Sequence, residues 1–174
     1  MVPEAPLERT DGGLVPGGEG WFVLNARDAR WLGGQFGAYT RFEGESRFPK
    51  LGFNIAVLEP GQPACRYHGE DEQEDFLVLA GMCLLLIEGQ ERSLKPWDFV
   101  HCPAWTAHVL IGAGDGPCAI LAVGTRLSDD VVYPASELAR QHGAGVERET
   151  RDPQQAYADV PPDVVVAYQS WLPG

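Results

Sequence analysis

The sequence has few basic side chains for its length. It contains 13 lysines and arginines against 25 aspartates and glutamates, so the formal net charge is −12. A surface of this charge repels the phosphates of nucleic acids and the headgroups of anionic membranes. The composition therefore predicts a partner that is neither a nucleic acid nor a membrane.

Several familiar motifs are also missing. The four cysteines, Cys65, Cys83, Cys102 and Cys118, form no CxxC pair, so free buried thiols are favoured over a zinc knuckle. The sequence has no Ser-His-Asp order, no phosphate-binding glycine loop and no P-loop lysine. It shows no basic and apolar leader, and no apolar run reaches the ~18 residues that span a bilayer. We therefore expect a cytoplasmic protein without a secretory signal.

Glycine and proline are abundant and separate many short apolar runs. The chain has 21 glycines and 14 prolines among 174 residues, and 44% of its residues are hydrophobic. Strand-like runs recur at about 8–12-residue spacing from residue 35 to residue 124, with turn residues between them. This pattern predicts one all-β domain, a sandwich or a barrel, with a core of useful size.

The composition also divides the chain into three parts. Residues 1–20 are rich in glycine, proline and glutamate, and we expect a flexible N-terminal tail there. Residues 21–126 carry the strand-like runs. Residues 127–174 are expected to form a helical extension, with helices over 134–141 and from Asp152 through Ala158. The apolar stretch 163–171 is expected to dock on the barrel or on a second subunit.

Candidate metal ligands cluster in and after the stretch 67–81. His68 and Glu70 are two residues apart, so on a strand they point to the same face. Glu74 heads the apolar run that follows, and His108 lies on a later apolar segment. Imidazole and carboxylate groups suit divalent Zn, Fe, Mn, Ni or Co.

The alternative is that this acidic stretch is only a solvated loop, as most charge runs are. We prefer that interpretation for Asp71 and Glu72. Glu74 differs, because a fully apolar strand follows it directly. Gln73 remains a reserve ligand in case Glu70 points away from the site.

The region from Gly61 to about Ile111 resembles the cupin superfamily. The first cupin motif pairs two histidines with a glutamate and a closing glycine, and these positions fall on His68, Glu70, Glu74 and Gly81. The proline and histidine of the second motif fall on Pro103 and His108. The departures from the motifs are Glu70 in place of the second histidine, Trp97 and Trp105 in place of two glycines, and Gly112 in place of asparagine.

The resemblance implies a cupin-type double-stranded β-helix, that is, a jelly-roll barrel. It implies one divalent transition metal inside the barrel, held by His68, Glu70, Glu74 and His108. It also implies a homodimer and a small-molecule ligand or substrate. The identity of the metal stays open, because Glu70 changes the ligand set.

Two functions follow, and they belong to different classes. The first is a metal-dependent enzyme on a small organic molecule, similar to dioxygenases, isomerases or decarboxylases, with Glu74 or Glu70 as a base. The second is a non-catalytic binding or sensing module, for which the divergent Trp97 and Trp105 are the motivation. The fold alone does not choose between them.

Four neighbouring side chains have two interpretations each. Trp105 either walls the mouth of the pocket or packs at the rim. His101 is expected near the surface or behind a ligand rather than on the metal. Arg66 either meets an anionic substrate or pairs with a carboxylate. Tyr67 alternates with His68, so a role as a catalytic acid is the weaker expectation.

Overall fold

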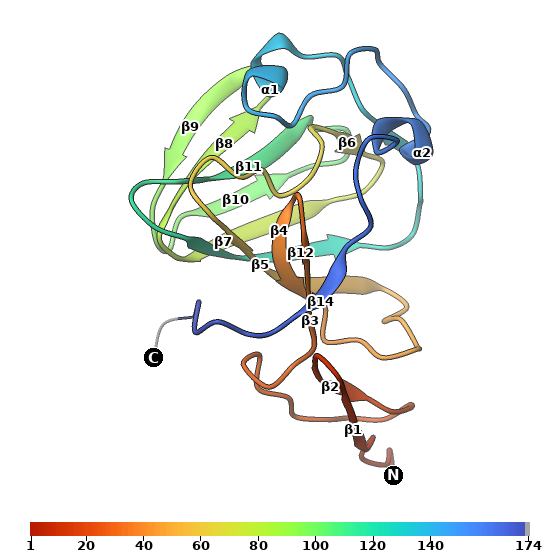
Figure 1. The fold of residues 1–174 in the computed structure, drawn as a ribbon. Helices are drawn as coiled ribbons and strands as arrows, with labels where there is room; N and C mark the ends of the chain where they lie inside the picture. Colours follow the sequence, from red (N-terminus) through yellow and green to blue (C-terminus); the bar gives the residue numbers. More distant parts are fainter. Residues whose placement is uncertain (173–174) are drawn as a thin grey trace.

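Antiparallel β-sheet dominates the protein, and the largest sheet has seven strands (Figure 1). The computed structural model describes residues 1–172. The strand order across this sheet is β10-β7-β12-β5-β4-β3-β14. The strands are β3 (Trp31–Gly34), β4 (Gly37–Thr40), β5 (Leu51–Leu58), β7 (Glu74–Ala80), β10 (Phe99–Cys102), β12 (Cys118–Thr125) and β14 (Val164–Val166).

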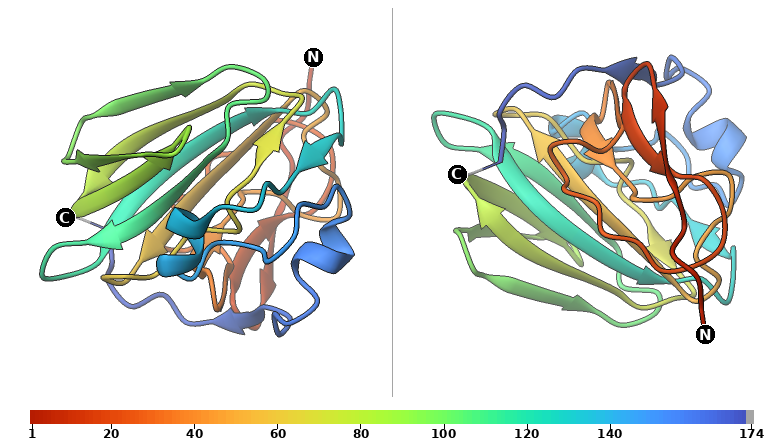
Figure 2. Two further views of the ribbon diagram at one scale, coloured as in Figure 1. Left: turned by 90° about the horizontal axis from the view of Figure 1, so that it is seen from above. Right: turned by 90° about the horizontal axis from the view of Figure 1, so that it is seen from below.

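A smaller sheet faces the first one and closes the barrel (Figures 1 and 2). Its order is β11-β8-β9, and a short pair, β13-β6, lies at one end. These strands are β6 (Gly69–Glu70), β8 (Met82–Ile87), β9 (Gln90–Leu94), β11 (His108–Ala113) and β13 (Val131–Val132).

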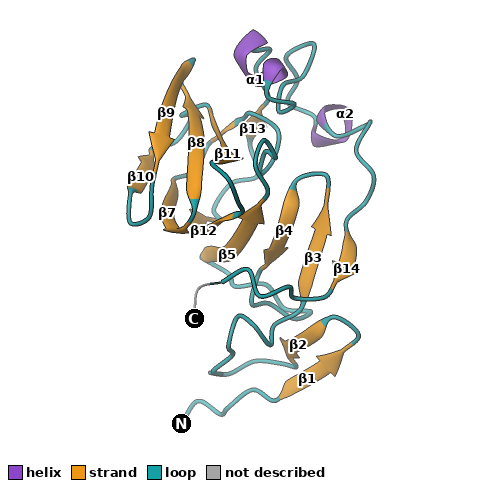
Figure 3. Cartoon of the chain, turned by 60° about the vertical axis from the view of Figure 1, so that its left-hand side comes forward, coloured by secondary structure: helices purple, strands orange, loops and turns teal. Residues whose placement is uncertain are grey.

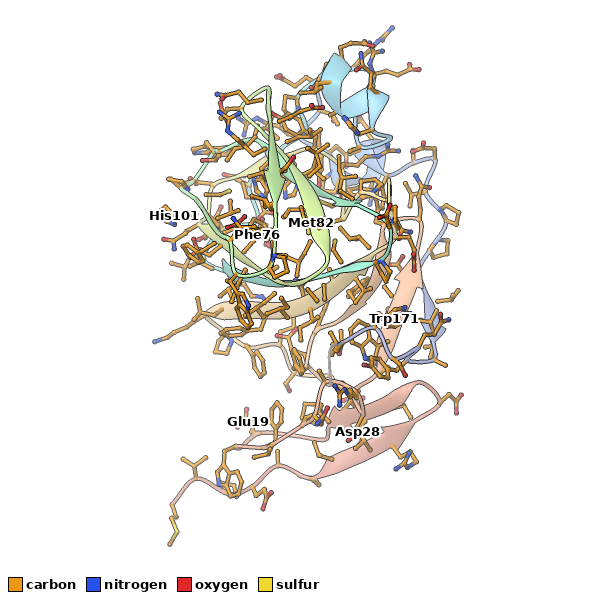
Figure 4. The ribbon with its side chains drawn as sticks, turned by 90° about the vertical axis from the view of Figure 1, so that its left-hand side faces the viewer. Glu19, Asp28, Phe76, Met82, His101 and Trp171 are labelled. Atoms are coloured by element: carbon orange, nitrogen blue, oxygen red, sulfur yellow. The ribbon has the colours of Figure 1, made fainter. Side chains whose placement is uncertain are left out.

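Both sheets contribute apolar side chains to a common core. Phe76 and Val78 come from the large sheet, and Leu85 and Leu110 come from the small one. On β7 the inward positions alternate, so Phe76 and Val78 are buried while their neighbours are less so. Figure 4 shows Phe76 inside the ring of strands. The architecture confirms the predicted all-β jelly-roll barrel.

The outer face of the large sheet is covered by the C-terminal segment. Trp31 is fully buried there. Its ring lies 5.8 Å from that of Tyr168 and 5.2 Å from that of Trp171, measured between centroids. Figure 4 shows Trp171 between the barrel and the N-terminal hairpin. Of the two expected docking places for the stretch 163–171, the structure shows the barrel.

The N-terminal residues contain regular structure where a flexible tail was expected. β1 (Leu7–Thr10) and β2 (Gly13–Pro16) form an antiparallel hairpin below the barrel (Figure 1). The glycines that suggested a tail instead make its turn, and Gly13 has a φ of +133°. The backbone amide of Leu14 donates to the carbonyl of Asp28 at 2.7 Å, which fastens the hairpin to the following segment.

Two short helices follow the barrel strands. α1 (Glu137–Gln141) is capped by the hydroxyl of Ser136, and α2 (Pro153–Ala156) is capped by the carboxylate of Asp152. Both lie at the end of the barrel that carries β6 and β13, as Figure 1 shows for β6 and Figure 3 for β13. The segment also adds strand β14 to the large sheet, so it is less helical than expected. The domain boundaries at residues 20 and 126 remain predictions.

Across residues 1–172, the helices are too short to cross a lipid bilayer. The longer helix, α1, has 5 residues.

Two tryptophans have a backbone conformation that favours glycine. Trp97 has a φ of 75° and Trp105 a φ of 68°. These are the positions where the cupin motif places glycine. The turn geometry therefore persists although the residue type does not, at a strain of roughly 1 kcal/mol for each residue. Both side chains are largely exposed, 73% for Trp97 and 41% for Trp105.

Candidate metal centre

Three predicted ligands converge inside the barrel. One ligand atom from each of His68, Glu74 and His108 lies within 4.8 Å of the other two. Glu74 Oε2 is 3.1 Å from His108 Nε2 and 3.9 Å from His68 Nε2. Both histidines are buried, and Glu74 is partly buried. The two histidine rings are 5.1 Å apart between centroids.

The β-structure explains this convergence of side chains that are distant in the sequence. Glu74 opens β7 and shares the inward face of Phe76, two residues on. His108 opens β11 in the opposite sheet. His68 lies just before β6 and forms an antiparallel bridge with His108. The amide of His108 donates to the carbonyl of His68 at 2.8 Å, and the reverse bond is 3.2 Å long.

Both histidines are oriented by the same kind of hydrogen bond. Nδ1 of His68 is 2.7 Å from the carbonyl oxygen of Arg66, and Nδ1 of His108 is 2.9 Å from that of Thr106. A carbonyl oxygen can only accept, so each Nδ1 donates its proton. Each Nε2 then presents a lone pair to the cluster. This is the arrangement that metal-ligating histidines commonly use.

The fourth predicted ligand lies beside the cluster. Oε1 of Glu70 is 3.4 Å from Nε2 of His68. Gln73, the reserve ligand, is exposed and donates from Nε2 to Asp75 at 2.6 Å. The geometry therefore favours Glu70 over Gln73, and coordination by Glu70 remains a prediction.

The cluster lines a cavity of about 340 Å³ in the barrel. Aromatic side chains form much of its wall: Phe36, Tyr39, Phe76, Tyr133 and Tyr157. Arg41 contributes a permanent positive charge to the lining. A second, more open cavity of about 580 Å³ shares Asn54, Glu70, Glu74 and Tyr133 with it. The candidate centre is therefore reachable from outside and large enough for a small organic molecule.

The electrostatic environment of the cluster favours positive charge. Burial alone would lower the pKa of His68, but the Cys65 sulfur and the carboxylates of Glu70 and Glu74 outweigh it and raise the pKa well above 6.5. Burial likewise opposes protonation of His108, yet contacts with Cys102 and Glu74 raise its pKa to about 10. The hydrogen bond with His68 lowers the pKa of Glu70.

A divalent cation bound between His68, Glu74 and His108 would supply this positive charge. It would compete with protons for both Nε2 atoms, because metal ligands must be deprotonated. Two imidazole nitrogens and one or two carboxylates make a donor set that fits a transition metal.

The remaining candidates lie outside the cavity wall. Arg66 pairs with the carboxylate of Asp159 at 2.6 Å, which is the second of its expected roles. The hydroxyl of Tyr67 accepts from the amide of Gly89 at 3.3 Å, away from the cluster. His101 is half-exposed and contacts Asp75 at 2.6 Å (Figure 4).

The two divergent tryptophans lie outside the lining of the cavity. The ring of Trp105 stacks under Arg151, 5.2 Å from its guanidinium carbon, and so takes the rim-packing role. Neither Trp97 nor Trp105 lines the cavity. They therefore no longer motivate a loss of catalytic function.

Sequence reasoning missed the aromatic wall. Tyr133 lies against His68 with the ring centroids 6.0 Å apart, and burial raises the pKa of its phenol. Tyr157 packs edge-on against Tyr133 at 5.8 Å. Both belong to the segment after the barrel strands, where no local pattern marks a site. The pairing of β13 with β6 and the hydrogen bond from the amide of Arg66 to the Tyr157 hydroxyl bring this segment to the cavity.

The fold is a β-barrel whose cavity is large enough for a small molecule, and the cavity wall carries a cluster of two histidines and a glutamate that suits a metal. Residues 54–124 match the family model described as a cupin domain. This match and the jelly-roll fold identify a cupin domain within the chain.

Comparison with a curated protein and with solved structures adds detail. The chain is 30% identical over 67 residues to a 5-nitrosalicylic acid 1,2-dioxygenase from Bradyrhizobium sp. The match covers 38% of this chain and 32% of that protein, so the chain spans about a third of the length of this relative.

Two solved structures share the fold. One is described as a predicted oxalate decarboxylase from Thermotoga maritima, with a TM-score of 0.54, 17% identity, and coverage of 61% of this chain and 100% of that one. The other is the polyketide cyclase RemF from Streptomyces resistomycificus, with a TM-score of 0.53, 13% identity, and coverage of 60% and 79%. At these identities the likeness concerns the fold alone.

Proposed function

We propose that the protein is a metal-dependent enzyme that acts on a small organic molecule inside the barrel. One divalent transition metal, Zn, Fe, Mn, Ni or Co, would be held by His68, Glu74 and His108, with Glu70 as a fourth ligand. The observation that carries this proposal is the convergence of two oriented Nε2 atoms and a carboxylate oxygen on one wall of an accessible cavity. Such a metal supplies Lewis-acid polarisation of substrate oxygens.

The chain's own residues assign the remaining tasks. Glu74 lies at the boundary of both cavities, so its carboxylate is placed to accept a proton from a bound substrate. The aromatic wall favours a planar apolar ring. Arg41, on the same lining, favours an acid group on that ring.

A dioxygenase acting on an aromatic hydroxy acid fits these features best. The name of the relative, a 5-nitrosalicylic acid 1,2-dioxygenase, supports this choice over an isomerase or a decarboxylase. The aromatic lining and the single arginine of the cavity support it independently.

The test is a metal analysis followed by an oxygen-uptake screen. Purified protein is analysed for metals, stripped with a chelator and reloaded separately with Fe, Mn, Co, Ni or Zn. Each form is then offered salicylate, catechol and simple diols in an oxygen electrode. We expect oxygen uptake that depends on both one metal and an aromatic hydroxy acid. Tight ligand binding without turnover in any form would instead identify a binding or sensing module.

Location and assembly belong to the same proposal. All four cysteines are free thiols, which supports a reducing cytoplasm. The homodimer stays a prediction that sedimentation would test. Tyr168 and Trp171 are already packed on Trp31, so they are not available as the apolar interface that the sequence suggested.

A further inference from the structure

Tyr133 is held rigidly next to the candidate ligands. It directly follows β13, which pairs with β6 so that Val131 lies opposite Glu70. Its backbone exchanges two hydrogen bonds with Thr150, of 2.8 and 3.2 Å. The position of Tyr133 is thus tied to the strand that carries Glu70.

The ring of Tyr133 is buried in the wall of the cavity. Its exposed fraction is 6%. It faces the His68 ring at an interplanar angle of 36° and meets the Tyr157 ring edge-on at 85°. It lines both the barrel cavity and the more open cavity beside it. The residue therefore stands where the two spaces join.

The hydroxyl of Tyr133 differs from the hydroxyls of Tyr67, which is also buried, and Tyr157, which is partly buried. Tyr157 accepts a hydrogen bond from the amide of Arg66, and Tyr67 accepts one from Gly89. Within residues 1–172, the Tyr133 hydroxyl has no hydrogen-bond partner. In the same residues, every side-chain oxygen that is fully sealed from solvent does have a partner. The hydroxyl must therefore open into the cavity space.

We propose that Tyr133 is a substrate-binding residue whose hydroxyl donates a hydrogen bond to an anionic oxygen of the molecule held at the centre. The inference rests on the proposed function and specifies its substrate class: a small aromatic acid with oxygens that can reach both the metal and this hydroxyl. A phenol keeps its proton at neutral pH and is thus a donor. Hydrogen bonds to a charged oxygen are stronger than neutral ones.

The test is a titration that does not depend on turnover. The protein is loaded with Co(II), whose visible spectrum reports its coordination, and titrated with salicylate. Tyr133→Phe keeps the ring against His68 and removes only the hydroxyl. We expect it to load cobalt fully and to bind salicylate about tenfold more weakly.

Tyr67→Phe is the matched control. Tyr67 is also buried and adjoins His68 in sequence, but its hydroxyl contacts Gly89 outside the cavity. Its salicylate affinity should stay within about twofold of the unaltered protein. If Tyr133→Phe fails to fold, Tyr133→Met supplies a second variant without a donor.

The outcomes separate this inference from the proposed function. Full cobalt loading with equal salicylate affinity in Tyr133→Phe and the unaltered protein overturns the role of Tyr133 alone. Weaker salicylate binding by Tyr133→Phe, together with no oxygen uptake by any metal form, supports the substrate-binding role of Tyr133 and contradicts the proposed dioxygenase activity. Failure of the unaltered protein to bind cobalt overturns both.

Discussion

The two candidate histidines reach the same point from different kinds of structure. His108 lies on a strand of the small sheet, paired residue by residue with β8. His68 lies outside the named strands, in a segment held by Arg66, whose side chain reaches into the chain after the barrel. One candidate ligand is thus fixed by sheet pairing and the other by contacts distant in sequence. The difference shows which part of the site a local pattern can specify.

Replacement of His108 should have the largest effect. We expect His108→Ala to weaken metal binding more than about 100-fold, because even changes behind a ligand cost about 10–100-fold. Elemental analysis and a competitive chelator titration measure this loss. His101→Ala is the matched control, since His101 is half-exposed and its ring pairs with Asp75 outside the cavity. Full metal occupancy in His108→Ala would contradict the assigned ligand set.

Replacement of Arg66 should affect His68, the histidine whose position depends on contacts distant in sequence, and not His108. Its guanidinium donates to the carbonyls of Gly145 and Ala156, each at 3.1 Å, and pairs with Asp159. Its own carbonyl accepts from Nδ1 of His68. We expect Arg66→Met to lower the free energy of unfolding by about 2–4 kcal/mol, because it leaves carbonyl groups without donors. Metal affinity should fall about tenfold as His68 loses its fixed orientation.

The control for Arg66 is Arg140, an arginine on α1 in the segment after the barrel. Arg140 is exposed and pairs with Glu137 on one helix turn. Arg140→Met should change the free energy of unfolding by no more than about 0.5 kcal/mol. Denaturant unfolding and chelator titration measure both variants. Similar losses of stability and metal affinity in Arg66→Met and Arg140→Met would mean that Arg66 has no specific role in positioning His68.

The smallest expected effect is on the stability of the turns that precede His108. Two tryptophans in these turns, Trp97 and Trp105, have a positive φ. Trp97→Gly should raise the free energy of unfolding by about 0.5–1 kcal/mol, since glycine removes the strain and the exposed ring contributes little packing. Trp21→Gly is the control, because Trp21 is also exposed but lacks a positive φ. Destabilisation of Trp97→Gly equal to that of Trp21→Gly would show that the turn carries no such strain.

The sequence predicts the parts of this molecule that depend on local periodicity. The all-β class follows from short strand-like runs between turns, whereas the jelly-roll barrel and the meeting of His68, Glu74 and His108 follow from the resemblance to the two cupin motifs. The hairpin in residues 1–20 was missed, because glycines that form a turn look the same in sequence as glycines in a tail. Tyr133 was missed because its place depends on β13 pairing with β6, in which Val131 lies opposite Glu70, a residue far away in the sequence.

The β13-β6 pairing makes the wall of the pocket from two sources, the sheets and the loop after the barrel. The sheets hold His108 and Glu74, whereas the loop after the barrel delivers Tyr133 and Tyr157. Exchanges of Tyr133 or Tyr157 would reshape the pocket while Glu74 and His108 keep their places on the sheets. His68 is different, because Arg66 ties its segment to Gly145 and Asp159 of the same loop. The loop after the barrel therefore shapes the wall of the pocket and also supports one of its two histidines.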